Sequence, residues 1–327
     1  MNKIGLILLF LIFLCAGISA QEKEFVIRGQ IPGMRDSIAV SLLTAEELPT
    51  TTICETVVKD GCFELRGQVK GPMLCTLITT NIRSLAEGEE IRWTYTPVFV
   101  DNVDMRVQAS HYDRIPLDAP ITSDFKITGG RVQADFNEYN LWKLQGKGDK
   151  DFILANPSSA ISVYLGNKML RRGYNLMREE VEGLEKAIVG APDDPERFAT
   201  FLRNCALAKL TAKGNSIVNL PLNDINGKAC ELSEVIPTGK YVLVDFWATW
   251  CGPCVAAIPG IKELAERFPE DLVVIGVSCD TDLNAWKVAI EKKQAKWAQY
   301  VLTKQGYKDF LEKYQISGVP YFLILDK

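Results

Sequence analysis

The chain has 327 residues, of which 47% are hydrophobic and 24% are charged, and its formal net charge is −4. This composition is typical of a globular protein that is long enough for two or more domains. A weakly acidic chain without a basic block gives no support to nucleic-acid binding.

The first twenty residues have the pattern of a secretory signal. Lys3 precedes an apolar run from Ile4 to Ile18, and Ser19-Ala20 supplies small residues at a cleavage site. The run is short for a membrane span. We expect a signal peptide over residues 1–20, cleavage after Ala20 and export. An uncleaved membrane anchor is the alternative.

Residues 21–130 have the pattern of a β-rich domain, in which short β-branched and aromatic runs alternate with turn residues. Asp60-Gly61 between two such runs predicts a β-hairpin. We expect an antiparallel sandwich or barrel, and its function is unknown because it shows no catalytic constellation. The predicted strands cover residues 25–29, 37–43, 51–59, 62–65, 73–80, 91–100, 105–109 and 125–128.

Residues 131–215 change to helical periodicity and predict a helical connector. Ser158 or Ser159 is a candidate N-cap for one of its helices. The predicted helices cover residues 138–144, 160–177, 179–189 and 196–212.

Residues 216–327 alternate between buried strands and amphipathic helices, which predicts an α/β domain with a largely parallel central sheet. The whole chain is therefore expected to be multidomain. The predicted strands of this last domain cover residues 241–246, 272–278, 297–302 and 321–325, and the helices cover 252–268, 283–293 and 308–314.

Two cysteines, Cys251 and Cys254, lie where strand 241–246 leads into helix 252–268. A C-x-x-C at such a junction is a redox signature, because the helix N-terminus has unpaired N–H groups and a positive dipole that favour a thiolate. We predict that Cys251 is exposed at the turn and forms a mixed disulfide with a substrate. Cys254 faces inward and resolves that disulfide.

Asp245 is the one charged residue in an otherwise apolar strand. A buried carboxylate is costly unless it has partners or a purpose. We predict that Asp245 lies beneath the cysteine pair and accepts the proton of Cys254. A carboxylate that is hydrogen-bonded for structural reasons is the alternative.

The chain has no paired Cys/His set with metal-ligand spacing, so no metal is expected. No cofactor is predicted either, because the Cys251–Cys254 dithiol would itself carry the electrons. The other cysteines of the mature chain are interpreted as small buried hydrophobic residues; they are Cys54, Cys62, Cys75, Cys205, Cys230 and Cys279.

The sequence DFWATWCGPC, from Asp245 to Cys254, resembles the thioredoxin signature, and Gly318-Val319-Pro320 resembles that family's cis-proline loop. The resemblance implies a thioredoxin fold over residues 216–327. It also implies a cis peptide bond before Pro320 and a pairing of Val319 with extended substrate.

Three further residues at the motif, Trp250, Gly252 and Pro253, are predicted to contact the substrate together with Val319 and Pro320. A helical insertion around residues 282–297 and the signal segment are similar to the exported TlpA/ResA branch, although Asp245 is more typical of thioredoxin itself. Residues 24–215 look like the domains that precede thioredoxin modules in Bacteroidetes proteins. The thioredoxin fold continues with one more strand and a helix, so the resemblance to that family implies a domain truncated after strand 321–325.

These observations predict a periplasmic thiol-disulfide oxidoreductase, and Gly-Pro between the cysteines favours a disulfide reductase. Its substrates would be disulfide-containing envelope proteins, and its electron donor a membrane dithiol relay. The alternative is an envelope binding or assembly module whose truncated thioredoxin domain is inactive or only docks. A peroxidase is disfavoured because Val244 and Ala248 replace the Pro and Thr of the peroxiredoxin motif.

Overall fold

The computed structural model describes residues 23–46, 49–171 and 176–327. The chain divides into two compact units, the first ending at Asn137 and the second beginning at Glu138. The predicted signal segment, residues 1–20, lies outside the described residues. Within the described ranges, no helix has both the length and the hydropathy that a membrane crossing requires.

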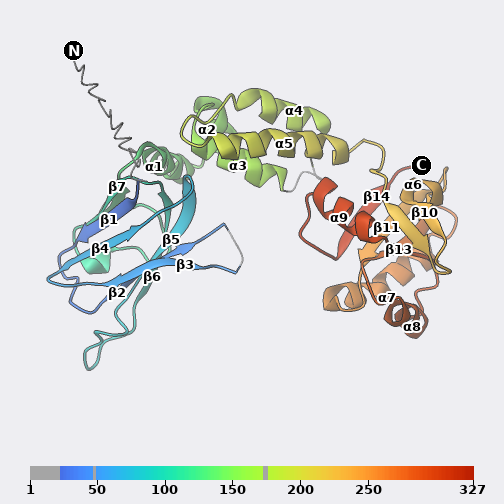
Figure 1. The fold of residues 1–327 in the computed structure, drawn as a ribbon, viewed down its shortest axis with the longest axis horizontal. Coiled ribbons are helices and arrows are strands. Elements are labelled where there is room, and N and C mark those ends of the chain that lie inside the picture. Colours follow the sequence, from blue (N-terminus) through green and yellow to red (C-terminus); the bar gives the residue numbers. More distant parts are fainter. Residues whose placement is uncertain (1–22, 47–48, 172–175) are drawn as a thin grey trace, which may run out of the picture. The chain divides into compact units, whose positions relative to one another are not determined.

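The strands described in the first unit form two four-stranded sheets, with orders β4-β1-β7-β8 and β3-β2-β5-β6 (Figure 1). Ile27 and Val107 of one sheet and Leu42 and Leu77 of the other are buried in a single core, so the sheets pack as a sandwich. The antiparallel β domain is confirmed, with the parallel pair β1–β7 as an exception. The elements are β1 (Phe25–Gln30), β2 (Ala39–Thr44), β3 (Thr52–Val57), β4 (Cys62–Gly67), β5 (Met73–Thr80), β6 (Trp93–Val100), β7 (Asp104–Ala109), the 3-10 helix η1 (Tyr112–Arg114) and β8 (Phe125–Thr128).

The turn at Asp60-Gly61 closes only the tip of the predicted β-hairpin. Lys59 and Cys62 form only an isolated bridge, while β3 pairs with β2 and β4 pairs with β1. Both turn residues have positive φ, as in a two-residue hairpin turn, and Lys59 and Cys62 exchange two backbone hydrogen bonds of 2.9 Å. The hairpin prediction is confirmed at the turn and wrong for the strands, which separate because their alternating apolar residues cover one core from opposite sides.

The helices that follow are α1 (Arg131–Leu144), α2 (Asp149–Ala155), α3 (Ala160–Leu170), α4 (Arg178–Ala187) and α5 (Pro195–Thr211). The predicted helical connector is confirmed, and Ser159 caps α3 by accepting a hydrogen bond from the Ile161 N–H at 3.1 Å. The sequence missed α2, which is too short to show helical periodicity. Helix α3 ends at Leu170, before the predicted end at residue 177.

The remaining described strands of the second unit form one six-stranded sheet with the order β10-β9-β13-β12-β11-β14. Strands β11, β12 and β13 are parallel, whereas β9, β10 and β14 pair antiparallel. The prediction of a largely parallel sheet therefore holds only for its central strands. The elements are β9 (Pro221–Asp224), β10 (Ala229–Glu231), α6 (Leu232–Val235), β11 (Tyr241–Trp247), α7 (Gly252–Arg267), β12 (Leu272–Ser278), α8 (Leu283–Lys293), β13 (Ala298–Leu302), α9 (Lys304–Lys313) and β14 (Tyr321–Leu325).

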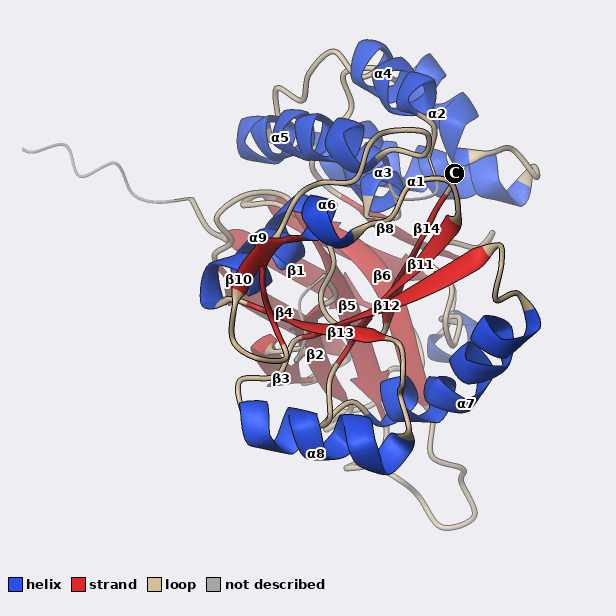
Figure 2. Cartoon of the chain, turned by 90° about the vertical axis from the view of Figure 1, so that its right-hand side faces the viewer, coloured by secondary structure: helices blue, strands red, loops and turns tan. Residues whose placement is uncertain are grey.

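Strand β11 is buried between two helices. Leu243 packs against Ile261 of α7, and Phe246 points the other way and stacks on Phe310 of α9 with ring centroids 4.2 Å apart. Figure 2 shows α7 and α9 on opposite sides of the sheet. Because alternate residues of a strand face opposite sides, Asp245 lies on the α7 side with Leu243.

Two glycines in the helical part of the second unit should respond oppositely to alanine. A Cβ on Gly166 in α3 would lie 2.6 Å from Cδ1 of Ile188 and 2.8 Å from Cε2 of Phe201, and both side chains are fully buried. Gly166→Ala should therefore lower the free energy of unfolding by about 1–3 kcal/mol.

Gly183 in α4 is the matched control because nothing lies within 4 Å of its Cβ position. Gly183→Ala should raise the free energy of unfolding by about 0.5–1 kcal/mol, since alanine has the higher helix propensity. Urea unfolding of both variants measures these changes. A Gly166→Ala protein as stable as the wild type would contradict the close packing of α3 against α5.

Candidate active site

Cys251 and Cys254 form a disulfide at the N-terminus of α7, with an S–S distance of 2.05 Å. Strand β11 ends at Trp247, and Cys251 is the N-cap of α7. Cys254 is 1% exposed, which confirms that it faces inward. Cys251 is only 5% exposed, so the prediction of an exposed Cys251 was wrong for the disulfide form.

The burial of Cys251 has a visible cause in the loop before β14. The Val319–Pro320 peptide bond is cis, as the resemblance implied. The Val319 carbonyl oxygen lies 3.5 Å from Sγ of Cys251 and covers it. A disulfide sulfur carries no proton, so this is a contact in the oxidised form, and a Cys251 thiol could donate a hydrogen bond to the same oxygen.

The N-terminus of α7 favours negative charge on Cys251. The backbone N–H of Cys254 donates to Sγ of Cys251 at 3.2 Å. A helix N-terminus and an N–H donor both stabilise a thiolate more than a thiol. The arrangement therefore lowers the cost of forming the nucleophile when the disulfide is reduced.

The residues that were predicted to contact substrate surround the disulfide. Trp250 is 65% exposed, Gly252, Pro253 and Pro320 are also exposed, and Val319 is half-buried. The fold thus presents surface residues from the β11–α7 loop, from the start of α7 and from the cis-proline loop. Their contact with a substrate stays a prediction.

Asp245 is buried in β11, with 2% of its surface exposed. Its neighbours in register are Gly276 of β12 and Phe322 of β14. In the described part of the chain, its Oδ1 atom has no hydrogen-bond partner. Burial raises the pKa of the Asp245 carboxyl to about 7, because a low-dielectric environment disfavours the charged form. The structural alternative of a hydrogen-bonded carboxylate finds no support at this oxygen.

A second buried carboxylate, Asp280, was missed by the sequence reasoning. It accepts hydrogen bonds from the Thr249 N–H at 3.0 Å, from the Thr249 hydroxyl at 2.7 Å and from the Ser278 hydroxyl at 2.8 Å. These bonds hold the loop that leads to Cys251. Its position just after a buried parallel strand, at the same sheet edge as the cysteines, was the available signal.

The other cysteines that the structure describes are reduced and lie outside the disulfide. Cys75, Cys205 and Cys279 are buried, and burial raises the pKa of each thiol to about 12, so they stay protonated. The interpretation as buried hydrophobic residues is wrong for Cys62, which is exposed on β4. No group of three or more metal-ligating side chains occurs among the described residues.

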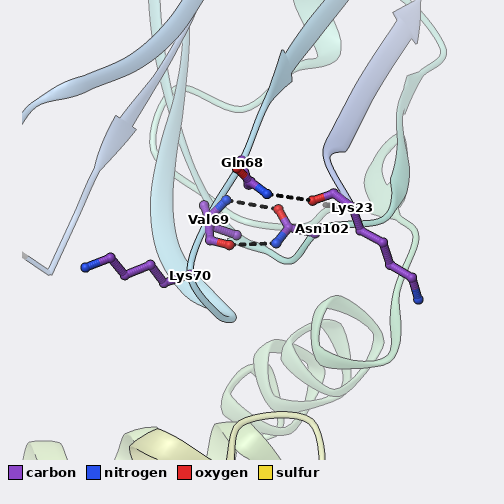
Figure 3. Close-up of a pocket in the computed structure, with 5 residues that line it drawn as sticks. All are labelled: Lys23, Gln68, Val69, Lys70 and Asn102. Atoms are coloured by element: carbon purple, nitrogen blue, oxygen red, sulfur yellow. Dashed lines mark hydrogen bonds between the residues drawn. The ribbon is translucent and has the colours of Figure 1, made fainter. Parts of the chain in front are cut away.

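A pocket in the first unit is lined by Lys23, Gln68, Val69, Lys70 and Asn102. Asn102 exchanges two hydrogen bonds with the Val69 backbone, and Gln68 donates to the Lys23 carbonyl. Figure 3 shows the two lysine side chains extending in different directions, away from Asn102. The side-chain amides of Gln68 and Asn102 are engaged in hydrogen bonds within the domain, and the two lysine side chains do not converge on one point.

Asp245 should make the stability of the oxidised protein depend on pH. The folded carboxyl has a pKa of about 7, against about 3.9 in an unfolded chain. Between these values the folded state binds more protons than the unfolded state. The free energy of unfolding therefore falls as the pH rises through this window, and this loss is complete above pH 7.

Asp245→Asn removes the titrating group and should raise the free energy of unfolding at pH 8 by up to about 4 kcal/mol. The gain should shrink toward pH 4. Urea unfolding between pH 4 and 8 measures it, with Glu263→Gln on the exposed side of α7 as a control that should follow the wild type. Wild-type and Asp245→Asn curves that stay parallel over this range would contradict the assigned pKa.

Comparisons with known proteins place two families on the chain. Residues 239–327 match the model of a thioredoxin-like family, and residues 25–136 match a domain of unknown function, DUF4369. The chain is 44% identical over 52 residues to a thioredoxin of Mycolicibacterium smegmatis, covering 16% of this chain and 46% of the relative. It is 31% identical over 114 residues to the thiol-disulfide oxidoreductase ResA of Bacillus cereus, covering 35% of this chain and 64% of ResA.

The chain thus spans less than two thirds of the length of these relatives. Among solved structures, the thioredoxin domain of a thiol-disulfide oxidoreductase from Bacteroides vulgatus is 34% identical, with a TM-score of 0.33, and the match covers 35% of this chain and 81% of that one. A thiol:disulfide interchange protein from Bacteroides sp. matches with 34% identity and a TM-score of 0.33, over 35% of this chain and 75% of that one. The chain therefore carries an N-terminal DUF4369 domain and a C-terminal domain of the thioredoxin-like family, homologous to the ResA-type thiol-disulfide oxidoreductases.

Proposed function

We propose that this protein is an exported thiol-disulfide oxidoreductase that reduces protein disulfides through Cys251 and Cys254. The observation that carries the proposal is the disulfide at the N-terminus of α7, in contact with the cis-proline loop. A structural disulfide would not need a helix N-terminus, an N–H donor to one sulfur and a buried carboxyl on the same side of the sheet.

The reaction begins with the reduced dithiol. The Cys251 thiolate attacks one sulfur of a substrate disulfide, the substrate S–S bond breaks, and one substrate thiolate leaves. A mixed disulfide now joins Cys251 to the substrate. Cys254 loses its proton and attacks Sγ of Cys251, which forms the Cys251–Cys254 disulfide and releases the second substrate thiolate. Two electrons pass from the protein to the substrate.

Asp245 fits the role of the proton acceptor for Cys254. The carboxyl lies on the α7 side of β11, and α7 is the helix that carries Cys254. A pKa of about 7 leaves the group divided between its two protonation states near neutral pH, which is the condition under which a general base works best. Its Oδ1, which has no hydrogen-bond partner among the described residues, can receive the proton.

The surface beside the disulfide would bind the substrate. Trp250, Gly252 and Pro253 offer apolar contacts and an open approach, and Val319 and Pro320 offer backbone to an extended chain. The substrates proposed are disulfide-containing proteins of the cell envelope. A dithiol in the membrane would return the disulfide to its reduced form, with no further cofactor.

The periplasmic location rests on the signal pattern of residues 1–20. The direction of electron flow rests on the Gly-Pro pair between the cysteines. The reduction potential of the Cys251–Cys254 couple decides this direction. We expect a value near about −270 mV, and one near about −120 mV would identify an oxidase instead.

Single cysteine variants test the reaction itself. Cys251→Ser should abolish the reduction of insulin disulfides, because no nucleophile remains. Cys254→Ala should retain a mixed disulfide with its substrate, which non-reducing gel electrophoresis detects. Cys62→Ser is the control, because Cys62 is exposed but lies in the first unit, and it should reduce insulin at the wild-type rate. Activity that survives in Cys251→Ser would refute the proposal.

A further inference from the structure

Three residues lie in one row across the centre of the six-stranded sheet. Asp245 of β11 pairs with Gly276 of β12, and Gly276 pairs with Gln299 of β13. Paired residues of neighbouring strands point to the same face. Asp245 and Gln299 therefore flank a position that has no side chain.

The Gln299 carboxamide fills that position. A Cβ on Gly276 would lie 2.3 Å from Oε1 and 2.8 Å from Nε2 of Gln299, so the amide rests directly on the glycine. Gln299 is 8% exposed. Because neighbouring strands are about 4.8 Å apart, the amide lies roughly one strand spacing from β11 at Asp245.

The carboxamide also holds the last residue of β11, just before the loop that leads to the cysteines. Its Oε1 accepts a hydrogen bond from the Trp247 indole N–H at 3.2 Å, across 52 residues of sequence. Its Nε2 donates to the Ala295 carbonyl at 3.4 Å, which is a long bond. The Nε2 group therefore has a proton that is bonded weakly or not at all. This proton can turn toward Asp245, whose Oδ1 lacks a partner among the described residues.

The other groups around Asp245 supply no positive charge. On the same side of the sheet, α7 carries Cys254, which is held in the disulfide. Cys279, just after β12, interacts electrostatically with Asp245, and the register partner of Asp245 in β14, Phe322, is apolar. Asp245 makes no ion pair within the described residues. The Gln299 amide is therefore the polar group best placed to respond when the carboxyl ionises.

We propose that Gln299 is a positioning residue of the dithiol site: its carboxamide fixes the Trp247 indole and forms the polar wall beside the Asp245 carboxyl. Loss of the amide should make the ionised carboxyl less favourable. The role in the reaction rests on the proposed function, but the contact itself can be measured without turnover.

The first test uses the unmodified, purified protein in its oxidised form. Carbon NMR follows the Asp245 carboxyl from pH 5 to 9, with Asp245→Asn to assign it, and nitrogen NMR follows the Gln299 side-chain amide and the Trp247 indole. Both nitrogen signals should shift with the same midpoint as the carboxyl. Signals that do not move at that midpoint would overturn the proposal.

The second test compares variants. Gln299→Leu removes the amide, and Gly276→Ala displaces it through the added Cβ. Each should raise the midpoint of the Asp245 titration by about 0.5–1 pH unit. Gln299→Glu retains an acceptor for Trp247 but adds an acid, so it should also raise the midpoint while leaving the indole signal in place. Tyr300→Phe, next to Gln299 on the opposite face of β13, is the control and should leave the midpoint unchanged.

Insulin reduction separates this inference from the proposed function. The pH at which the wild-type rate is half maximal should rise in Gln299→Leu and Gly276→Ala along with the carboxyl midpoint. If the wild-type protein fails to reduce insulin, the proposed function is refuted, but the NMR test of Gln299 still applies. Folded Gly276→Ala and Gln299→Glu proteins with a wild-type midpoint would refute the inference alone, even if Gln299→Leu does not fold.

Discussion

The site depends on one constraint, which is that β11 is buried between α7 and α9 and then passes directly into α7. Burial on both faces requires an apolar strand, and it isolates the one carboxyl that the strand carries. The short loop after Trp247 places Cys251 at the N-cap of α7, where N–H groups and the helix dipole meet the sulfur. The dithiol and the acid are therefore products of the same strand–helix junction.

Two buried carboxylates near this junction have opposite environments. Asp280 accepts hydrogen bonds from Thr249 and Ser278 and holds the loop before Cys251. Asp245 has an oxygen without a partner in the described residues, and burial alone raises its pKa. A satisfied carboxylate stabilises structure, whereas an unsatisfied buried one is costly, and its raised pKa makes it a candidate for proton transfer.

The features suited to redox chemistry lie in the thioredoxin-like domain. The sandwich of the first unit has its own core, and the Gln68 and Asn102 amides of its pocket are hydrogen-bonded to backbone groups of Lys23 and Val69. Its cysteines are reduced, and Cys75 is buried with a raised pKa.

The sequence by itself determined the local features. Periodicity located most strands and helices, and the C-x-x-C, Asp245 and Val319-Pro320 were visible as residues at fixed positions along the chain. Tertiary structure decided what depends on distant partners. Beyond the Asp60-Gly61 turn, β3 and β4 enter two different sheets instead of pairing with each other, because they cover one core from opposite sides. Cys251 is buried because the cis-proline loop, 68 residues later, lies against it. Gln299 and Asp280 acquire their roles from partners 52 and 31 residues away. A hydrogen bond or a contact across such a separation has no local pattern, since it forms only when the sheet brings the strands together.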